Sequence, residues 1–168
     1  MNQLKKTMDT ILRTVCIVLF SLLVLLVTWQ IVTRLIFNNP SVWTEEAARY
    51  TFIWLSLIGI SVATGERADV AIDFLVRKVP VVAQRVVVAI AYLSSLAFAT
   101  VFMVWGGALN AQLAWNQANP VLPVNQGVLY LAVPVSGVLL TFYLGYHFVR
   151  IVTAREDATV SDEIQVEL

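Results

Sequence analysis

Long runs without a charged side chain divide the sequence into apolar segments. No Asp, Glu, Lys or Arg occurs in residues 14–33, 50–65 or 86–149. A helix needs about 20 apolar residues to cross the hydrocarbon core of a bilayer, and these runs are too uniform for the buried helices of a soluble protein. The pattern therefore predicts four membrane-spanning helices, at about 14–37, 42–64, 82–109 and 127–149.

Turn-forming residues separate the first two spans. The sequence Asn38-Asn39-Pro40-Ser41 ends the first span, because proline and the residue before it disfavour a continuing helix. The second helix begins within residues 41–44, where a serine or threonine hydroxyl is available to cap it. A start this early makes the helix long enough to span the membrane, and it places Glu45, Glu46 and Arg49 at the membrane boundary.

Residues 66–79 contain the densest charge cluster and have the spacing of an amphipathic helix. Glu66, Asp69, Asp73 and Arg77 fall on one helical face. The opposite face is apolar and consists of Ala68, Ala71, Ile72, Leu75 and Val79. This pattern predicts a helix that lies in the plane of the membrane interface between spans two and three.

Residues 3–13 have a similar pattern and lead directly into the first span. Lys5, Asp9 and Arg13 follow one another at intervals of four, so we expect an amphipathic lead-in within the headgroup region. The fold class is therefore an all-α integral membrane protein. Residues 1–155 are expected to form a single four-span membrane domain, and residues 156–168 a mobile cytoplasmic tail.

Lysine and arginine are distributed unevenly between the two sides of the membrane. One side carries only Arg34 and Arg49, together with the uncharged linker 110–126. The other side carries the remaining nine: Lys5, Lys6, Arg13, Arg67, Arg77, Lys78, Arg85, Arg150 and Arg155. The positive-inside rule then predicts a multi-pass protein of the bacterial inner membrane with both termini in the cytoplasm.

Composition argues against several classes of function. The chain is 59% hydrophobic and 13% charged, whereas a soluble domain carries about 25% charged residues. The lipid bilayer is therefore its expected surrounding. The formal net charge is zero, which argues against nucleic acid as a partner. A single cysteine, Cys16, excludes an internal disulfide and a cysteine-based metal cluster.

No catalytic centre is evident. His147 is the one histidine, whereas a haem or metal site in a helical bundle needs at least two ligands. Its place beside Arg150 predicts an interfacial residue. A glycine-rich phosphate loop, a Ser-His-Asp set and paired carboxylates within the membrane are all missing from the sequence. We therefore expect no enzymatic activity, no cofactor and no bound metal.

Small residues in the third span, among them Gly106-Gly107, permit another helix to approach closely. Packing within this chain and docking against another membrane subunit both account for them. The two interpretations stay open at this point.

The segment from Trp43 to Tyr50 carries charge at the edge of the hydrocarbon core. Glu45 and Arg49 are four residues apart, and Glu46 and Arg49 are three apart, so Arg49 is within reach of both carboxylates. Arg34, near the end of the first span, is a possible second cation. Such groups are costly at this depth unless they are paired, and they are often functional. The alternative is a solvated helix start whose acidic first turn suits the helix dipole.

The same segment resembles a known family. Asn39-Pro40 followed by the pattern Trp43-x-Glu45-Glu46-x-x-Arg49-Tyr50 resembles the second helix of the small membrane subunit of tripartite ATP-independent periplasmic (TRAP) transporters. Phe52, Trp54, Leu55 and Gly59 extend the resemblance along this helix. Ile72-Asp73-Phe74-Leu75 resembles a Val-Asp-x-Leu segment of the family. The chain departs from the family pattern at Asp69, where histidine is frequent, and at Ala71, where a basic residue is frequent.

This resemblance implies two partners and a supporting role. The family's small subunit associates with a large, many-spanning membrane subunit that carries the substrate and sodium sites. A periplasmic binding protein delivers an organic acid, such as a dicarboxylate or sialic acid, and sodium gradients usually drive uptake. The small subunit would then be a scaffold. The candidate partner interface comprises Trp43, Glu45, Glu46, Arg49, Arg34, Asp73 and Leu75.

Two other classes of membrane protein are compatible with four spans. A self-sufficient small transporter or exporter requires a buried ionisable residue in mid-span, and the apolar runs contain none. A membrane-anchored assembly or adaptor protein unrelated to transport shares every compositional feature. It is distinguished only by lacking the Trp-x-Glu-Glu-x-x-Arg-Tyr pattern.

Overall fold

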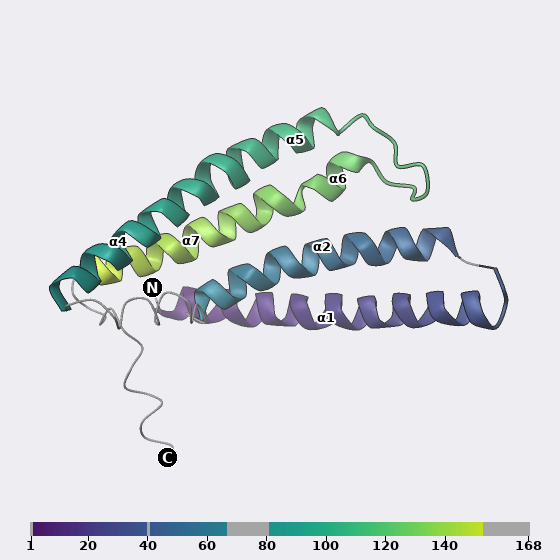
Figure 1. Cartoon of the computed structure of the whole chain (residues 1–168), viewed down its shortest axis with the longest axis horizontal. Coiled ribbons are helices and arrows are strands. Elements are labelled where there is room, and N and C mark those ends of the chain that lie inside the picture. Colours follow the sequence, from purple (N-terminus) through teal and green to yellow (C-terminus); the bar gives the residue numbers. More distant parts are fainter. Residues whose placement is uncertain (1, 40, 67–80, 153–168) are drawn as a thin grey trace, which may run out of the picture.

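The computed structural model of this chain describes residues 2–39, 41–66 and 81–152. Its helices are α1 (Asn2–Leu35), α2 (Val42–Gly65), α4 (Val81–Phe98), the π-helical η1 (Ala99–Gly106), α5 (Gly107–Leu113), α6 (Gln126–Tyr130) and α7 (Ala132–Val152) (Figure 1). Four helical segments of this part of the chain are long and apolar enough to cross a membrane: Lys5–Leu35, Val42–Gly65, Val87–Leu113 and Gln126–Val149. The predicted all-α membrane fold with four spanning helices is confirmed.

Two segments predicted from the sequence lie largely or wholly outside the described residues. Apart from Glu66, which caps the end of α2, the predicted interfacial helix 66–79 lies outside the described residues. The predicted tail 156–168 does so as well.

Local chemistry explains the turn between α1 and α2. Asn38 adopts a left-handed conformation with φ of 51°, which asparagine tolerates better than most residues. The next backbone N–H, that of Asn39, then donates to the Thr33 carbonyl at 3.2 Å. Ser41 stands at the N-cap of α2 without a side-chain cap bond, so the cap expected from a hydroxyl is not formed. The Thr44 hydroxyl instead donates to the Ser41 carbonyl at 2.8 Å.

The fourth span is interrupted between α6 and α7. Pro134 lies one turn beyond Tyr130, and it has no N–H with which to continue the helical hydrogen bonding to that residue. The chain keeps its direction because Val135 N–H donates to the Leu131 carbonyl at 3.1 Å. A proline break of this kind bends the span without ending it.

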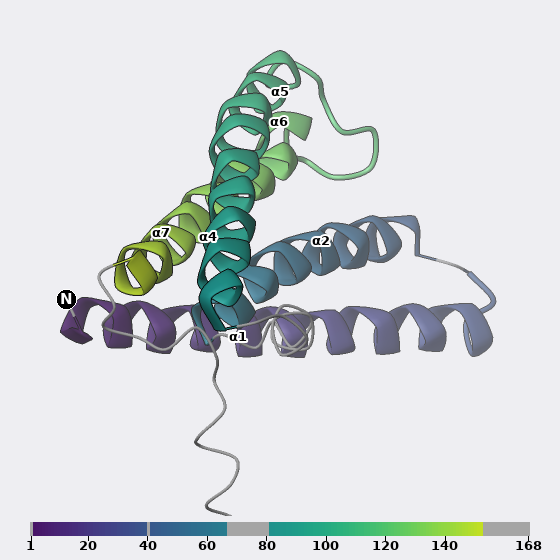
Figure 2. The same cartoon turned by 60° about the vertical axis from the view of Figure 1, so that its left-hand side comes forward.

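The helices form two hairpins that lie side by side. Helices α1 and α2 make the first hairpin; α4, η1 and α5 run outward and α6 and α7 return to make the second (Figure 1). We call the end of the molecule at which α1 begins the terminal end. The opposite end, which holds the α1–α2 turn and the α5–α6 connection, is called the loop end. Helix α2 packs against both α1 and α7, and α7 packs against α4 and η1. Figure 2 shows the second hairpin rising away from the first toward the loop end.

This row of helices leaves α1 at its edge. In the most apolar 18-residue stretch of α1 no residue is buried, whereas 39% of the corresponding stretch of the fourth span is buried. Ile17, Phe20 and Leu25 are among the exposed apolar side chains of α1. A face of this kind contacts lipid or another membrane protein.

Two apolar clusters hold the row together. Val88, Tyr92, Ala99, Leu140 and Leu144 pack between α4, η1 and α7. Leu12, Ile58 and Tyr143 join α1, α2 and α7.

Glycines bring the two arms of the second hairpin into close contact. A Cβ at Gly107 would lie 3.0 Å from Pro134 Cδ, and one at Gly137 would lie 2.8 Å from Met103 Cβ. Gly107 therefore serves packing within the chain, whereas a Cβ at Gly106 would meet only the Val101 carbonyl oxygen, at 3.7 Å.

His147 lies near the end of α7, as its position in the sequence predicted, but its side chain is buried between helices. It is 1% exposed, with its Nε2 3.4 Å from the Gly65 carbonyl oxygen. The rings of Tyr92 and Tyr146 lie beside it. The burial was not predicted, because hydropathy gives the depth of a residue along a helix and not the face on which it lies.

Candidate functional site

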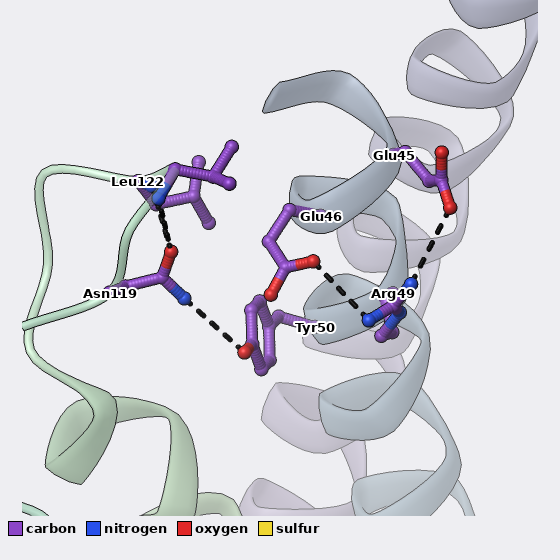
Figure 3. A network of polar contacts seen from close by, with 7 residues as sticks. Glu45, Glu46, Arg49, Tyr50, Asn119 and Leu122 are labelled. Carbon is purple, nitrogen blue, oxygen red and sulfur yellow. Dashed lines mark hydrogen bonds and ion pairs between the residues drawn. The ribbon is translucent and has the colours of Figure 1, made fainter. Parts of the chain in front are cut away.

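The charged cluster at the start of α2 has the pairing that its spacing predicts. The Arg49 guanidinium lies 3.4 Å from Glu45 Oε1 and 3.3 Å from Glu46 Oε2 (Figure 3). Both pairs lie on one helical face, so Arg49 neutralises one of two adjacent carboxylates. The group of three carries a net charge of −1, from two carboxylates and one guanidinium.

The two carboxylates differ in their surroundings. The side chains of Glu45 and Arg49 are 59% and 58% exposed, but that of Glu46 is only 18% exposed. An exposed ion pair contributes about 0–1 kcal/mol to stability. The Glu45 and Arg49 side chains are therefore accessible to another molecule, whereas Glu46 is a fixed part of the helix surface.

Asn119 extends this cluster into the second hairpin, and the sequence analysis missed it. Its side chain is 9% exposed in the connection between α5 and α6. Its amide nitrogen Nδ2 donates to the Tyr50 hydroxyl at 3.3 Å. Figure 3 shows Tyr50 between Glu46 and Asn119, so the network runs from α2 to the connection.

The same asparagine organises its own turn. Asn119 Oδ1 accepts hydrogen bonds from the backbone N–H groups of Val121 (2.8 Å) and Leu122 (2.9 Å). The Asn119-Pro120 dipeptide favours such a turn, because asparagine bonds to backbone two and three residues ahead. That local signal was available in the sequence. The partner in α2 was not, since Tyr50 is 69 residues away.

Backbone hydrogen bonds keep the connection in place. Asn119 N–H donates to the Val124 carbonyl at 3.2 Å, and Gln126 N–H to the Gln117 carbonyl at 2.8 Å. Ala118 and Asn125 form an isolated antiparallel bridge. The stretch expected from sequence to be a polar linker thus holds Asn119 at a fixed position.

The other two predicted site residues that the structure describes, Arg34 and Trp43, are not joined to this network. Arg34 lies exposed in the last turn of α1, and no ion pair of its side chain occurs among the described residues. A cation there interacts favourably with the helix dipole. Trp43 is 53% exposed in the first turn of α2. Asp73 and Leu75 lie outside the described residues.

The geometry at this end suits recognition by another protein. Among the residues that the structure describes, no group of three or more His, Cys, Asp or Glu is placed to hold a metal ion. At the loop end, the charged side chains of Glu45 and Arg49 and the indole of Trp43 are exposed. The connection between α5 and α6 lies at the same end. Such a surface is typical of the polar rim of a protein–protein contact.

Comparison with known proteins gives this surface its context. Residues 23–154 match the family described as tripartite ATP-independent periplasmic transporters, DctQ component. A Haemophilus influenzae protein described as a TRAP transporter small permease is 31% identical over 144 residues, which cover 86% of this chain and 89% of the relative.

Two further relatives match shorter parts. The sialic acid TRAP transporter small permease protein SiaQ of Vibrio cholerae is 35% identical over 80 residues, 48% of this chain and 46% of SiaQ. The isethionate TRAP transporter permease protein DctMQ of Oleidesulfovibrio alaskensis is 33% identical over 99 residues, 57% of this chain and 15% of DctMQ. The resemblance drawn from the start of the second helix is thereby confirmed, and the chain belongs to the DctQ family of small permease subunits of TRAP transporters.

Proposed function

We propose that this chain is the scaffold subunit of a TRAP transporter that imports an organic acid across the bacterial inner membrane. It works with a large many-spanning subunit, a periplasmic binding protein and a sodium gradient. The observation that carries the proposal is the open row of helices, in which the apolar stretch of α1 has no buried residue. The names of two relatives support the substrate class, because they refer to sialic acid and to isethionate, both organic anions.

A permanent membrane partner accounts for the exposed edge of the row. The DctMQ relative matches this chain over only 15% of its own length, so a small-permease sequence forms part of a much longer permease chain there. Covalent linkage of this kind favours a stable association of small and large subunits. The exposed face of α1 is an apolar surface on which the large subunit can pack.

The positions of the charges support a scaffold and not a transport pathway. In the described spans, charged residues lie near the helix ends: Lys5, Lys6, Asp9, Arg13, Arg34, Glu45, Glu46, Arg49 and Glu66. Ion coupling requires ionisable groups deep in the membrane. We therefore assign the substrate and sodium sites to the large subunit, and we propose no enzymatic activity, cofactor or metal for this chain.

The Lys/Arg asymmetry gives the proposed orientation. The terminal end, with both termini, faces the cytoplasm and the loop end faces the periplasm. Residues 1–155 act as one membrane domain, followed by a cytoplasmic tail at 156–168. Trp43, Glu45, Glu46, Arg49 and Arg34 then form the outer part of the partner interface, with Asp73 and Leu75 contributing on the cytoplasmic side.

Reconstitution tests the proposal directly. The chain and its large subunit are purified from the native membrane and placed in liposomes, together or singly, with the binding protein and a sodium gradient. Uptake of an organic acid is expected only when both membrane subunits are present. Uptake by this chain alone would contradict the scaffold role, and failure to copurify a large permease would favour an adaptor unrelated to transport.

A further inference from the structure

The terminal end holds a second polar network, in which three helices meet. The residues come from the first turns of α1, from the end of α2 and from the last turns of α7. They are Asp9, Arg13, Gly65, Glu66, Tyr143 and His147.

Tyr143 lies at the centre of this network. Its side chain is fully buried, and its hydroxyl donates to Asp9 Oδ1 at 2.6 Å. Its ring lies directly against the backbone of Gly65, where an added Cβ would be 2.7 Å from Cε1 of the ring. Only glycine leaves room for the ring at this position, so Tyr143 contacts α1 through its hydroxyl and α2 through its ring.

Neighbouring contacts reinforce the junction. Arg13 bonds to Glu66 Oε1 at 2.8 Å, which joins α1 to the end of α2. Leu12 and Ile58 are buried against Tyr143. The polar face of the α1 lead-in is thus turned toward α2 and α7.

Contacts between the hairpins are fewer toward the loop end. One turn of α2 before Gly65, the Ser61 hydroxyl lies 3.3 Å from the Ser136 carbonyl oxygen. Farther out an open pocket of about 210 Å³ separates them, and Asn119 reaches Tyr50 beyond it. The pocket is lined by Tyr50, Ile53, Gln126, Leu129, Tyr130 and Val133.

We infer that Asp9, Gly65 and Tyr143 form a latch that sets the angle between the two hairpins. The angle in turn determines the shape of the loop-end surface on which a partner would pack. The inference rests on the proposed scaffold function, because a fixed shape matters only if a partner packs on it. Hydrogen bonds are well suited to this task, since lipid provides no hydrophobic force to hold two apolar helices together.

A small rotation of α2 at the latch produces a larger displacement at the loop end, because the helix is long. Helix α2 has 24 residues, so at about 1.5 Å per residue it is about 36 Å long, and a rotation of about 10° at one end moves the other by about 6 Å. Asp9 and Tyr143 are accordingly positioning residues. They act on the partner surface without touching it.

Pulsed electron–electron double resonance, which measures the distance between two spin labels, tests the latch. Labels are placed at the exposed positions Val42 in α2 and Leu113 in α5, in a Cys16→Ser background, with the full chain in lipid nanodiscs. Tyr143→Phe is expected to broaden the distance distribution or shift it by several ångströms. The matched control is Tyr130→Phe, which removes a hydroxyl from an exposed tyrosine and leaves the distance unchanged.

Substitutions at Asp9 separate hydrogen bonding from charge. Asp9→Asn keeps an oxygen that accepts from Tyr143 and should restore most of the native distance, whereas Asp9→Leu should behave like Tyr143→Phe. The same variants that widen the distance should lower copurification of the large subunit about fivefold. An unchanged distance in both Tyr143→Phe and Asp9→Leu overturns the latch. If the complex still copurifies in that case, the scaffold function stands without it.

Discussion

The exposed ion pair at the loop end and the buried hydrogen bond at the terminal end are polar contacts of opposite kinds. At the loop end, the Glu45–Arg49 pair joins neighbouring turns of one helix and both side chains are more than half exposed. At the terminal end, Tyr143 and Asp9 join different helices, and the tyrosine is fully buried. A local, exposed network adds little to stability but is accessible to a partner, whereas a buried, long-range network holds the fold.

This contrast gives a graded set of expectations. Changes at the terminal end should affect stability first and assembly as a consequence. Changes at the loop-end charges should affect assembly with little effect on stability.

The largest effect is expected from Gly65→Ala. The new methyl group would overlap the Tyr143 ring, because the closest ring carbon lies 2.7 Å from the Cβ position. Overpacking together with a displaced hydrogen bond should reduce the free energy of unfolding by about 3 kcal/mol. Thermal unfolding of the full chain in nanodiscs measures the loss. Gly59→Ala and Gly145→Ala are the controls, since nothing lies within 4 Å of a Cβ at either position. An equal loss in the controls would show that helix glycines, and not the latch, control stability.

An intermediate effect is expected from Asn119→Ala. The variant removes the acceptor of two backbone N–H groups and the donor to Tyr50. Leaving these groups without their partners should lower the free energy of unfolding by about 1–2 kcal/mol.

Limited proteolysis at residues 114–125 adds a local readout for Asn119→Ala. Faster cleavage in the variant is expected because the turn loses its hydrogen bonds. Asn116→Ala, at an exposed position of the same connection, is the control. Cleavage at the same rate in all three proteins would show that the turn is held by its backbone alone.

The smallest effect on stability is expected from Arg49→Ala, at less than about 1 kcal/mol, because the Arg49 side chain is more than half exposed. Copurification of the large subunit and uptake of substrate should nevertheless fall. Reversing the pair with Glu46→Arg and Arg49→Glu should restore part of the loss if direct pairing matters. Wild-type assembly in Arg49→Ala would reduce the cluster to a solvated helix start.

The ion pair between Arg13 and Glu66 at the terminal end serves as a comparison for Arg49→Ala. Arg13→Gln also removes an exposed pair, with Glu66, and should cost less than about 1 kcal/mol. Unlike Arg49→Ala, it is expected to leave copurification close to the wild-type level, because Tyr143 and Asp9 remain joined. A loss of assembly as large as that of Arg49→Ala would remove the distinction between the two ends.

Sequence patterns predicted what depends on neighbours along the chain. Charge-free runs gave the four spans, and the three- and four-residue spacings gave the pairing of Arg49 with Glu45 and Glu46. These are consequences of helical geometry and of the cost of charge in lipid, and both are local.

The remaining contacts depend on how helices rotate against one another. Asp9 and Tyr143 are 134 residues apart, and the bond between them requires that both point into the same junction. An apolar span surrounded by lipid gives little indication of which face meets protein, because either environment accepts apolar side chains. For that reason the sequence did not reveal the burial of His147.

The π-helical segment Ala99–Gly106 limits where residues can be inserted into or deleted from this chain. A π-helical turn accommodates one residue more than an α-helical turn, and each residue of an α-helix advances by about 100° around the axis. Deleting a single residue from this segment would therefore turn α5 by about 100° relative to α4. Ala111, whose carbonyl oxygen lies 2.8 Å from a Cβ at Gly127, would then face away from α6. Single-residue insertions and deletions between Ala99 and Gly106 should accordingly be tolerated less well than substitutions, however apolar the inserted side chain.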